Sequence, residues 1–380
     1  MGIKGTESLR LDWRAVIERK DRIVASWSKS KEAAPETLGI TALRGKGIFT
    51  GPHEITVDGK AYSAEKIIVA TGSKPARPPI PGAEVGITSD ELIHLKHQPH
   101  RLVIIGGGFI GLEFGFALAW AGSKVTILQS GPQVAPALDD EIREMLLKAA
   151  GEAGITIVTN INVKAIAPDK TVEAEAGGVA QTFPADQVLL ATGRPSNVEP
   201  LRPQAAGIEL DRGAVKVNEY LQSVSAPHVY GVGDAAGKHQ HSPVAWYEGP
   251  IAAHNALKGN ARKVDFTIFP SAIFTIPAVG QVGLTEKEAL SRGLKAKVSK
   301  MPFDYNPAAG VRNETEGMVK VVYEEGTERI LGVHVIGARA EDIVQIGAVA
   351  MRGGLKKSDV GAMHYVFPTL GGAIFDAMAS

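Results

Sequence analysis

Residues 101–129, RLVIIGGGFIGLEFGFALAWAGSKVTILQ, decide the fold of this chain. The run at 102–105 is apolar, too short for a helix and rich in branched residues, which predicts a buried strand. Three glycines spaced G-x-G-x-x-G follow it, and residues 109–120 are apolar on nearly every side, as in a helix that is covered all round. A second apolar run at 124–128 predicts another strand. The stretch therefore predicts a strand-helix-strand unit.

The three glycines have the spacing of a dinucleotide-binding turn. Gly106 permits the tight turn, Gly108 lets a ligand approach the backbone, and Gly111 allows close contact between helix and strand. The start of the helix supplies unpaired N–H groups and the positive end of the helix dipole. Because strand, helix and second strand all follow in order, the motif predicts a pyrophosphate site rather than a glycine-rich turn without a ligand.

Gln129 stands at the end of the second strand, where the ribose-binding residue of such a unit is expected. An acidic residue there would bind the ribose hydroxyls of NAD, and a nearby Arg would pair with the extra phosphate of NADP. Gln can form the hydrogen bond but carries no charge, and residues 130–141 contain no Lys or Arg. The sequence therefore favours NAD and leaves NADP open.

The composition limits the classes of partner and chemistry. At 380 residues the chain has room for two or three domains, and Lys plus Arg equals Asp plus Glu at 41 each, so no overall charge favours nucleic acid or a membrane as partner. The start lacks the pattern of a secretion signal and no apolar stretch is long enough for a bilayer, so we expect a cytoplasmic protein. The count of 0 Cys excludes a thiolate nucleophile and a disulfide within these residues.

A repeated motif flanks the glycine turn. Residues 66–75, KIIVATGSKP, and residues 187–195, QVLLATGRP, are both apolar strands that run into an A-T-G turn. Such an echo is expected of two interleaved dinucleotide-binding domains. A third strand and turn, residues 226–237, carries Asp234, which fits either a contact to sugar hydroxyls or a helix N-cap.

The remaining segments predict simpler elements. Residues 13–27 have the apolar spacing of an amphipathic helix, and residues 40–62 read as a series of short strands. After residue 263 an α+β module begins, with a capping box at 285–288 and a hairpin over 318–336. The apolar helix at 341–351 fits burial in its own domain or against a second subunit. His239, His241 and His254 lack a supporting carboxylate or Cys at the spacing of zinc sites, so no metal site is expected.

Together these motifs resemble the class I pyridine nucleotide-disulfide oxidoreductases, the family of dihydrolipoamide dehydrogenase, glutathione reductase and mercuric reductase. The resemblance rests on GGGFIGLEFG, both A-T-G turns, VYGVGDAAG, FTIPAVGQVGLTEKEA and ILGVHVIG, and it covers essentially the whole chain. It implies an α/β fold with two interleaved Rossmann-like dinucleotide-binding domains, the first one incomplete, and a C-terminal α+β dimerisation domain. The implied FAD-binding remnant spans 1–99 and 191–262, the NAD(P)-binding domain 100–190, and the dimerisation domain 263–380.

The resemblance also implies cofactors and site residues, namely a flavoprotein that passes hydride between NAD(P)H and FAD. The implied NAD(P) contacts are Gly106, Gly107, Gly108, Phe109, Ile110, Gly111 and Glu113, with Gln129 at the ribose and Gly193 near the nicotinamide. The implied FAD contacts are Gly47 near the adenine, Asp234 at the ribityl chain, and Gln240, His241, Ser242 and Pro243 along the isoalloxazine. Glu113 matches a carboxylate that pairs with a lysine beside the flavin.

The chain departs from the family pattern in its catalytic groups. A second G-x-G-x-x-G for the ADP half of FAD and a C-x-x-x-x-C pair are absent, from which we expect an N-terminally truncated family member. The family's base is a His before Pro-Thr, whereas residues 367–372 here read FPTLGG, so His364 becomes the candidate base beside Glu113.

Three functional hypotheses follow. The first is an NAD(P)H-dependent FAD oxidoreductase, a homodimer acting on a small-molecule or disulfide-type electron acceptor, with no nucleic-acid or membrane partner. The second is a non-catalytic, NAD-binding dimeric homologue. The third is a fragment that needs its N-terminal part in trans.

Overall fold

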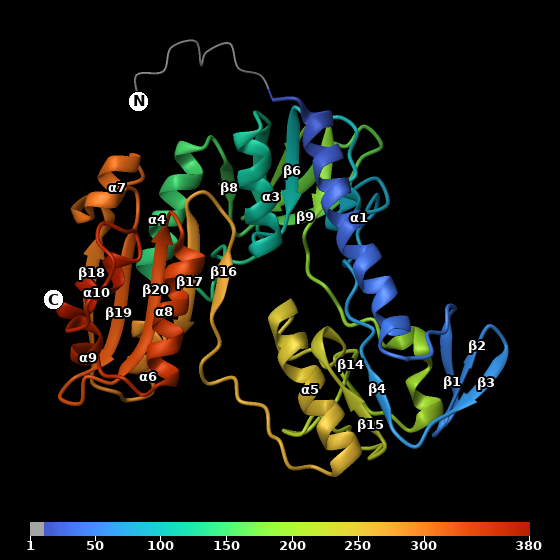
Figure 1. Cartoon of the computed structure of the whole chain (residues 1–380). Coiled ribbons are helices and arrows are strands. Elements are labelled where there is room, and N and C mark those ends of the chain that lie inside the picture. Colours follow the sequence, from blue (N-terminus) through green and yellow to red (C-terminus); the bar gives the residue numbers. More distant parts are fainter. Residues whose placement is uncertain (1–10) are drawn as a thin grey trace. The chain divides into compact units, whose positions relative to one another are not determined.

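The computed structural model describes residues 11–380 and resolves them into two compact units (Figure 1). Unit 1 comprises the residues up to Ala76, Ile93–His97 and Thr192–Asp265. Unit 2 comprises Arg77–Leu92, Gln98–Ala191 and Phe266–Ser380. Each unit is therefore built from three separate segments, so the two are interleaved along the chain. The division into three domains stays a prediction, because the nucleotide-binding and C-terminal segments fall within one unit.

A five-stranded parallel sheet organises the first half of unit 2. Its order is β5-β12-β6-β7-β8. The strands are β5 (Ile87–Thr88), β12 (Gln187–Leu190), β6 (Arg101–Ile105), β7 (Lys124–Leu128) and β8 (Thr156–Val158). The helices of this part are α2 (Ser89–Leu92), α3 (Phe109–Trp120) and α4 (Asp140–Glu152). The predicted strand-helix-strand unit is confirmed as β6-α3-β7, and every residue of β12 is buried, as expected for a central parallel strand.

A small antiparallel meander, which we did not predict, packs on this sheet. It consists of β9 (Asn162–Ile166), β10 (Val172–Ala176) and β11 (Val179–Phe183) in the order β11-β10-β9. Ile166 and Val172 join a buried cluster with Val103 of the parallel sheet.

The second half of unit 2 is an antiparallel sheet in the order β16-β17-β20-β19-β18. Its strands are β16 (Ser271–Ile273), β17 (Ala278–Gly283), β18 (Ala296–Pro302), β19 (Met318–Glu324) and β20 (Ile330–Gly337). The helices are α6 (Glu286–Ser291), α7 (Pro307–Arg312), α8 (Ala340–Arg352), α9 (Lys357–Gly361) and α10 (Gly372–Ala379), with the 3₁₀ turn η5 (Phe303–Tyr305). The predicted hairpin and the capping box between Thr285 and Glu288 are confirmed.

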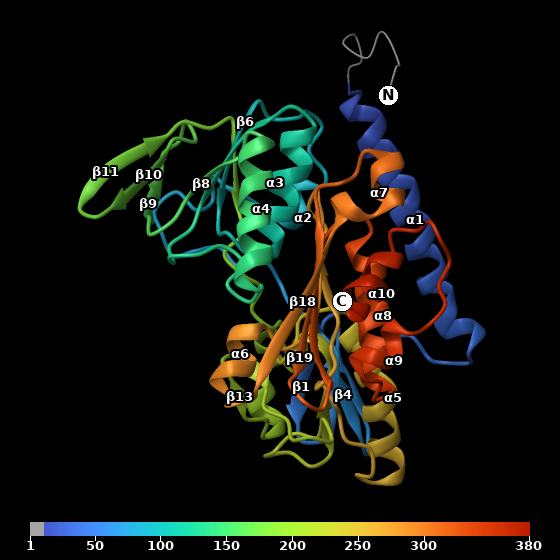
Figure 2. The ribbon, with the colours of Figure 1, turned by 90° about the vertical axis from the view of Figure 1, so that its left-hand side faces the viewer.

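The two faces of this antiparallel sheet are covered by different helices (Figure 2). Val321 and Val333 point toward α8 and α10. Val322 points the other way and packs with Ala289 of α6, on the face that also meets α4. Helix α8 buries Ile343 against its own sheet, so one face of this apolar helix is covered within the chain.

Unit 1 contains a parallel pair of strands, β4 (Ile67–Val69) and β15 (Val229–Gly231). The other strands are β1 (Gly47–Gly51), β2 (Glu54–Val57) and β3 (Lys60–Ser63) in one antiparallel sheet, and the hairpin β13 (Leu210–Asp211) with β14 (Ala214–Val215). The helices are α1 (Trp13–Thr37), α5 (Ser242–Lys258) and the 3₁₀ turns η2 (Glu199–Leu201), η3 (Pro203–Ala206) and η4 (Gly233–Ala235).

Two features of unit 1 differ from expectation. The strand predicted at 40–43 is irregular, because these residues follow Gly39 in a left-handed conformation, lie exposed and gain no partner strand. Helix α1 begins after its N-cap Asp12 as predicted, yet none of its residues is buried. Its apolar stripe therefore lies on the surface.

Candidate functional site

The glycine turn after β6 has the geometry that its spacing predicts. Gly106 has φ +113°, a conformation that residues with side chains rarely adopt, and its N–H donates to the Leu128 carbonyl at 2.8 Å. A Cβ at Gly111 would lie 2.1 Å from the Gly106 carbonyl oxygen, so only glycine permits this approach of helix to strand. A Cβ at Gly108 would meet no atom within 4 Å. The space beside Gly108 is therefore open.

The start of α3 offers backbone donors at this open space. Gly108 is the N-cap of α3 and supplies no side-chain cap, and the first turn holds no acidic residue. Ile110 lies in the first turn of the helix, so its N–H group has no acceptor within the helix. An anion such as a pyrophosphate meets favourable hydrogen bonding and the positive end of the helix dipole here.

Gln129 lies against the glycine turn. Its Oε1 accepts a hydrogen bond from the Gly107 N–H at 2.9 Å, and the Gly107 carbonyl accepts from the Ala135 N–H at 3.0 Å. A Cβ at Gly107 would stand 2.4 Å from Cγ1 of Val134, so the segment after Gln129 packs directly on the turn. Sequence reasoning placed Gln129 at the ribose, and the structure gives it a further role in fixing the turn.

Glu113, the next candidate on α3, is half-buried. Its Oε1 accepts a hydrogen bond from the Phe274 N–H at 3.0 Å. Burial raises the pKa of Glu113, and the hydrogen bond from Phe274 opposes that rise. The resemblance implied a lysine partner, whereas the partner in this structure is a backbone N–H.

Asp234 of unit 1 stands in η4, just after β15. Its Oδ2 accepts a hydrogen bond from the Ser73 hydroxyl at 2.5 Å, and the Arg194 Nε donates to the same hydroxyl oxygen at 3.1 Å. The backbone carbonyl of Asp234 accepts from Ser196. The alternative that Asp234 caps the next helix is wrong, because the N-cap of α5 is His241.

The segment predicted to line the isoalloxazine forms the start of α5. Gln240 donates from Nε2 to the Arg194 carbonyl at 2.6 Å, His241 is the N-cap, and Ser242 and Pro243 open the helix. Burial lowers the pKa of His241, and the charge of Asp234 opposes that shift. Gln240 therefore joins the network of Asp234 through Arg194 and Ser73.

Two predicted contacts lie at other places in unit 1. Gly193 has φ +116°, and its carbonyl accepts from the Ala76 N–H at 2.9 Å. Gly47 begins β1 opposite Val57, in a different sheet from the β4–β15 pair.

Ser73 and Arg194 are functional candidates that sequence reasoning missed. Each stands directly after one of the two A-T-G turns, and that equivalent placement was the signal available in the sequence. The two turns are paired, because the Lys74 N–H donates to the Pro195 carbonyl at 3.0 Å and the Asn197 N–H donates to the Gly72 carbonyl at 2.8 Å.

His364 lies exposed in the segment after α9 of unit 2, and its role as base stays a prediction. Its neighbour Tyr365 donates to Asp376 Oδ1 at 2.6 Å, and this hydrogen bond raises the pKa of Tyr365. Among residues 11–380, no cluster of three or more His, Cys, Asp or Glu side chains is placed to hold a metal ion. In the same range, no helix is both long and apolar enough to cross a membrane.

Family models and known proteins match this arrangement. Residues 12–256 match the pyridine nucleotide-disulphide oxidoreductase model, and residues 269–378 match the dimerisation domain of the same family. A solved HOCl-induced flavoprotein disulfide reductase, RclA from Escherichia coli, superposes with a TM-score of 0.90 at 28% identity, covering 97% of this chain and 86% of that one.

Curated relatives carry three kinds of name. A mercuric reductase of Bacillus cereus is 34% identical over 362 residues, which is 93% of this chain and 57% of the relative. A glutathione reductase of Burkholderia cepacia is 33% identical over 359 residues, covering 94% and 80%. A dihydrolipoyl dehydrogenase of Thermus scotoductus is 36% identical over 350 residues, covering 89% and 74%.

The length covered differs among these relatives, since this chain spans 57%, 65% and 66% of three mercuric reductases. The two family models nevertheless match most of the chain in the order that the resemblance implied, and the interleaved α/β fold with its C-terminal dimerisation domain is confirmed. The chain belongs to the pyridine nucleotide-disulphide oxidoreductases, a family that uses FAD and NAD(P)H.

Proposed function

We propose that this chain is an NAD(P)H-dependent flavoprotein oxidoreductase. The observation that carries the proposal is the open space beside Gly108 at the uncapped start of α3. Gly108 and Ile110 would direct backbone N–H groups at the pyrophosphate, and Gln129, which accepts the Gly107 N–H, would hold the turn in shape. FAD, when bound, supplies the group that accepts hydride from the nicotinamide.

The residues of unit 1 fit a flavin only in part. Asp234, Ser73 and Arg194 form a polar network after the parallel strands, and Asp234 would accept hydrogen bonds from ribityl hydroxyls. Glycines spaced for a second pyrophosphate do not occur in these 380 residues. We therefore place the ribityl chain at Asp234 and assign no residues to the flavin pyrophosphate.

The electron acceptor is limited by the composition of the chain. With 0 Cys, these residues cannot form the dithiol that would relay electrons to a disulfide. A small molecule reduced directly at the flavin needs no such relay. A disulfide acceptor would need thiols supplied from outside these residues.

The Gly108→Val variant tests the nucleotide site. The added side chain meets no protein atom at its Cβ, and the backbone of Gly108 has φ −78°, so the fold should tolerate it. The branched side chain should fill the space beside the turn and weaken NADH and NADPH binding by tenfold or more, on the order of 1.4 kcal/mol or above. Fluorescence titration measures the affinity, and thermal unfolding verifies the fold.

Gly151→Ala provides the matched control. Gly151 lies in α4, where a Cβ also meets no atom within 4 Å, so the variant should bind nucleotide as the wild type does. Unchanged affinity in Gly108→Val would place the nucleotide elsewhere and overturn the proposed site.

A second candidate function, nucleotide binding without turnover, is favoured by the parallel pair in unit 1. Sheets of only two strands are marginally stable, and the β4–β15 pair leaves Ile68 exposed. We infer that flavin binding needs further polypeptide packed beside these strands. If the purified chain shows visible flavin absorbance that NADH bleaches, the chain is an oxidoreductase without any added polypeptide. A colourless chain that binds NADH and gains flavin when a βαβ fragment is added would support completion in trans.

The dimerisation domain supports a homodimer as the working assembly. Val349 of α8 lies exposed beside the buried residues of the same helix, and Val366 after α9 is also exposed. Apolar surface of this kind is typical of subunit contacts. Sedimentation analysis at several concentrations tests the assembly, and a chain that stays monomeric throughout would contradict it.

A further inference from the structure

A charged lysine lies inside the packed face of the antiparallel sheet in unit 2. Strand β19 alternates, so Val319 and Val321 point into the core under α8 and α10, while Lys320 between them points to the opposite face. The side chain of Lys320 is only 4% exposed. A buried ammonium is costly unless its N–H groups are all taken up by partners.

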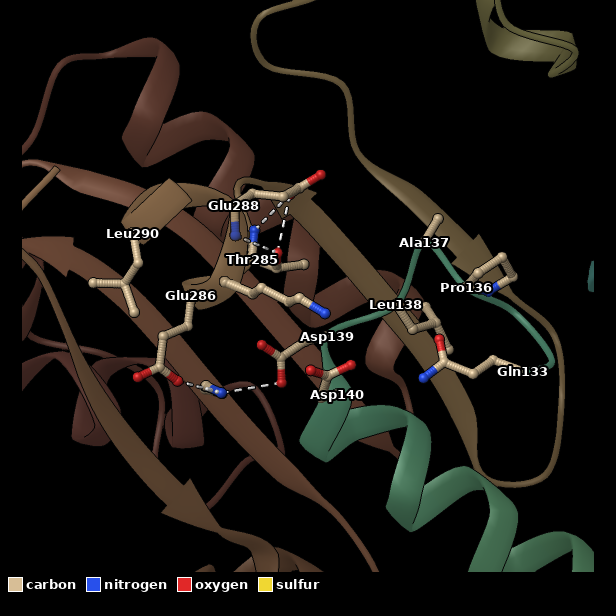
Figure 3. Close-up of a pocket in the computed structure, with 12 residues that line it drawn as sticks. Gln133, Pro136, Ala137, Leu138, Asp139, Asp140, Thr285, Glu286, Glu288 and Leu290 are labelled. Atoms are coloured by element: carbon tan, nitrogen blue, oxygen red, sulfur yellow. Dashed lines mark hydrogen bonds and ion pairs between the residues drawn. The ribbon is translucent and has the colours of Figure 1, made fainter. Parts of the chain in front are cut away.

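Three carboxylates surround the Lys320 ammonium. Its Nζ lies 3.0 Å from Asp139 Oδ1, 3.0 Å from Glu286 Oε2 and 3.4 Å from Glu141 Oε2. Figure 3 draws the ion pairs of Asp139 and Glu286 with this nitrogen as dashed lines, and all three residues line a cavity of about 440 Å³. Burial lowers the pKa of Lys320, but the hydrogen bonds to Glu286 and Asp139 outweigh it and raise the pKa overall. The ammonium is therefore charged at neutral pH.

Asp139 connects this lysine to α4. The side chain of Asp139 is 3% exposed, and its Oδ1 also accepts from the Glu141 N–H at 3.2 Å as the N-cap of α4. The preceding carbonyl, that of Leu138, accepts from Arg143 Nη1 at 3.2 Å. The end of the segment 130–139 is thus held by two buried cations, one from the sheet and one from α4.

The middle of the same segment is held at the nucleotide turn. The Leu138 N–H donates to the Ala135 carbonyl at 3.0 Å, and the Ala135 N–H donates to the Gly107 carbonyl at 3.0 Å. Ala135 has φ +41°, a strained conformation that persists only where the surroundings impose it. Segment 130–139 is therefore a short, fixed connection from Lys320 to Gly107.

We propose that Lys320 is a positioning residue for the nucleotide site: by holding Asp139 it keeps segment 130–139 seated against Gly107, so that the turn stays shaped for a pyrophosphate. This inference rests on the proposed function of the glycine turn. It gives the antiparallel sheet of the dimerisation domain a direct part in nucleotide affinity.

The Lys320→Met variant tests the proposal. It should weaken NADH binding by about tenfold, within the range seen when a change acts on a site through packed elements. Lys320→Arg keeps a charged donor and should restore most of the affinity. Lys300→Met is the matched control, because Lys300 lies opposite Lys320 on β18 and pairs with Glu141, but Asp139 is not among its partners. It should bind NADH as the wild type does.

A double-mutant cycle that combines Lys320→Met with Val134→Ala distinguishes a positioning role of Lys320 from a merely structural one. Val134 packs on Gly107, so if Lys320 acts through this segment its removal should matter less once the segment is loosened. Equal loss of affinity from Lys320→Met in both backgrounds would overturn the proposal. Hydrogen exchange of the Gly107 and Gly108 amides should also accelerate in Lys320→Met.

Asp139→Asn serves if Lys320→Met fails to fold. Asparagine keeps the N-cap but loses the charge that meets Lys320, so NADH affinity should again fall. If the wild type binds NADH and the folded variants bind it with the same affinity, the role of Lys320 is overturned while the proposed function stands. A wild-type chain that binds neither NADH nor NADPH overturns the proposed function and this inference together.

Discussion

The two strands that end in A-T-G turns lie in different surroundings. Strand β12 is buried at all four positions between β5 and β6 of unit 2. Strand β4 pairs only with β15 among the described strands, and its middle residue Ile68 is 41% exposed. Parallel sheets are normally covered on both faces. The local sequence therefore sets the strand and the turn, while the neighbouring segments decide whether a finished sheet surrounds them.

The largest expected effect tests that contrast directly. Ile104 of β6 is 0% exposed, so Ile104→Ala should lower the free energy of unfolding by about 4 kcal/mol through lost burial and a cavity. Ile68→Ala in β4 should cost less than about 1 kcal/mol, because its side chain already meets solvent. Urea unfolding of both variants gives the two values.

If Ile104→Ala and Ile68→Ala lower the free energy of unfolding by similar amounts, the difference in burial between β12–β6 and β4 does not hold in solution. That result would mean that β4 is covered in solution by a segment or subunit that buries Ile68. Measuring Ile68→Ala at several protein concentrations separates these cases, because cover from a second subunit depends on concentration and cover from the same chain does not.

A second test compares buried carboxyl groups in the two units. Burial raises the pKa of Glu248 in unit 1 and of Glu113 in unit 2, against hydrogen bonds from the Gly233 and Phe274 N–H groups. The folded state then holds these protons more tightly than the unfolded chain does. Stability is greatest below the unfolded pKa, about 4.3 for Glu, and falls as pH rises toward the folded pKa.

Glu248→Gln and Glu113→Gln should each reduce the loss of stability that accompanies rising pH. The glutamine keeps an acceptor for the backbone N–H and removes the charge whose burial costs stability. Thermal unfolding from about pH 4 to about pH 8 measures the slope, and Glu248→Gln should change it more, because Glu248 is almost fully buried. Slopes that match the wild type in both variants would show that neither pKa is raised.

The parts predictable from sequence are those set by local patterns. The glycine turn could be read from the spacing of Gly106, Gly108 and Gly111, and α6 from its capping box, because each depends on residues a few positions apart. The meander of β9 to β11 was missed, because its short strands are stabilised by packing against the parallel sheet. Residues 40–43 were wrongly predicted as a strand, because apolar alternation does not supply a partner strand.

In the candidate site, too, the sequence predicted what local patterns determine and missed contacts between distant residues. Lys320 reads in the sequence as an ordinary surface position of an alternating strand, and its partner Asp139 lies 181 residues away. Ser73 and Asp234 are 161 residues apart. Contacts at such separations follow from the fold as a whole, so the motifs located the turns, Gln129 and Asp234 but missed Ser73, Arg194 and Lys320.

The smallest expected effect concerns the apolar surface of unit 1. Trp246 of α5 is 75% exposed, so Trp246→Ser should change the free energy of unfolding by less than about 0.5 kcal/mol and reduce the binding of a dye that reports apolar surface. Val244→Ser on the same helix is the control, because Val244 is buried and its loss should cost about 2 kcal/mol. If Trp246→Ser costs as much as the control, α5 is covered in solution. The apolar surface of unit 1 would then be buried only in a larger assembly. The two units would differ in what buries their apolar residues, which is the chain itself in unit 2 and a partner in unit 1.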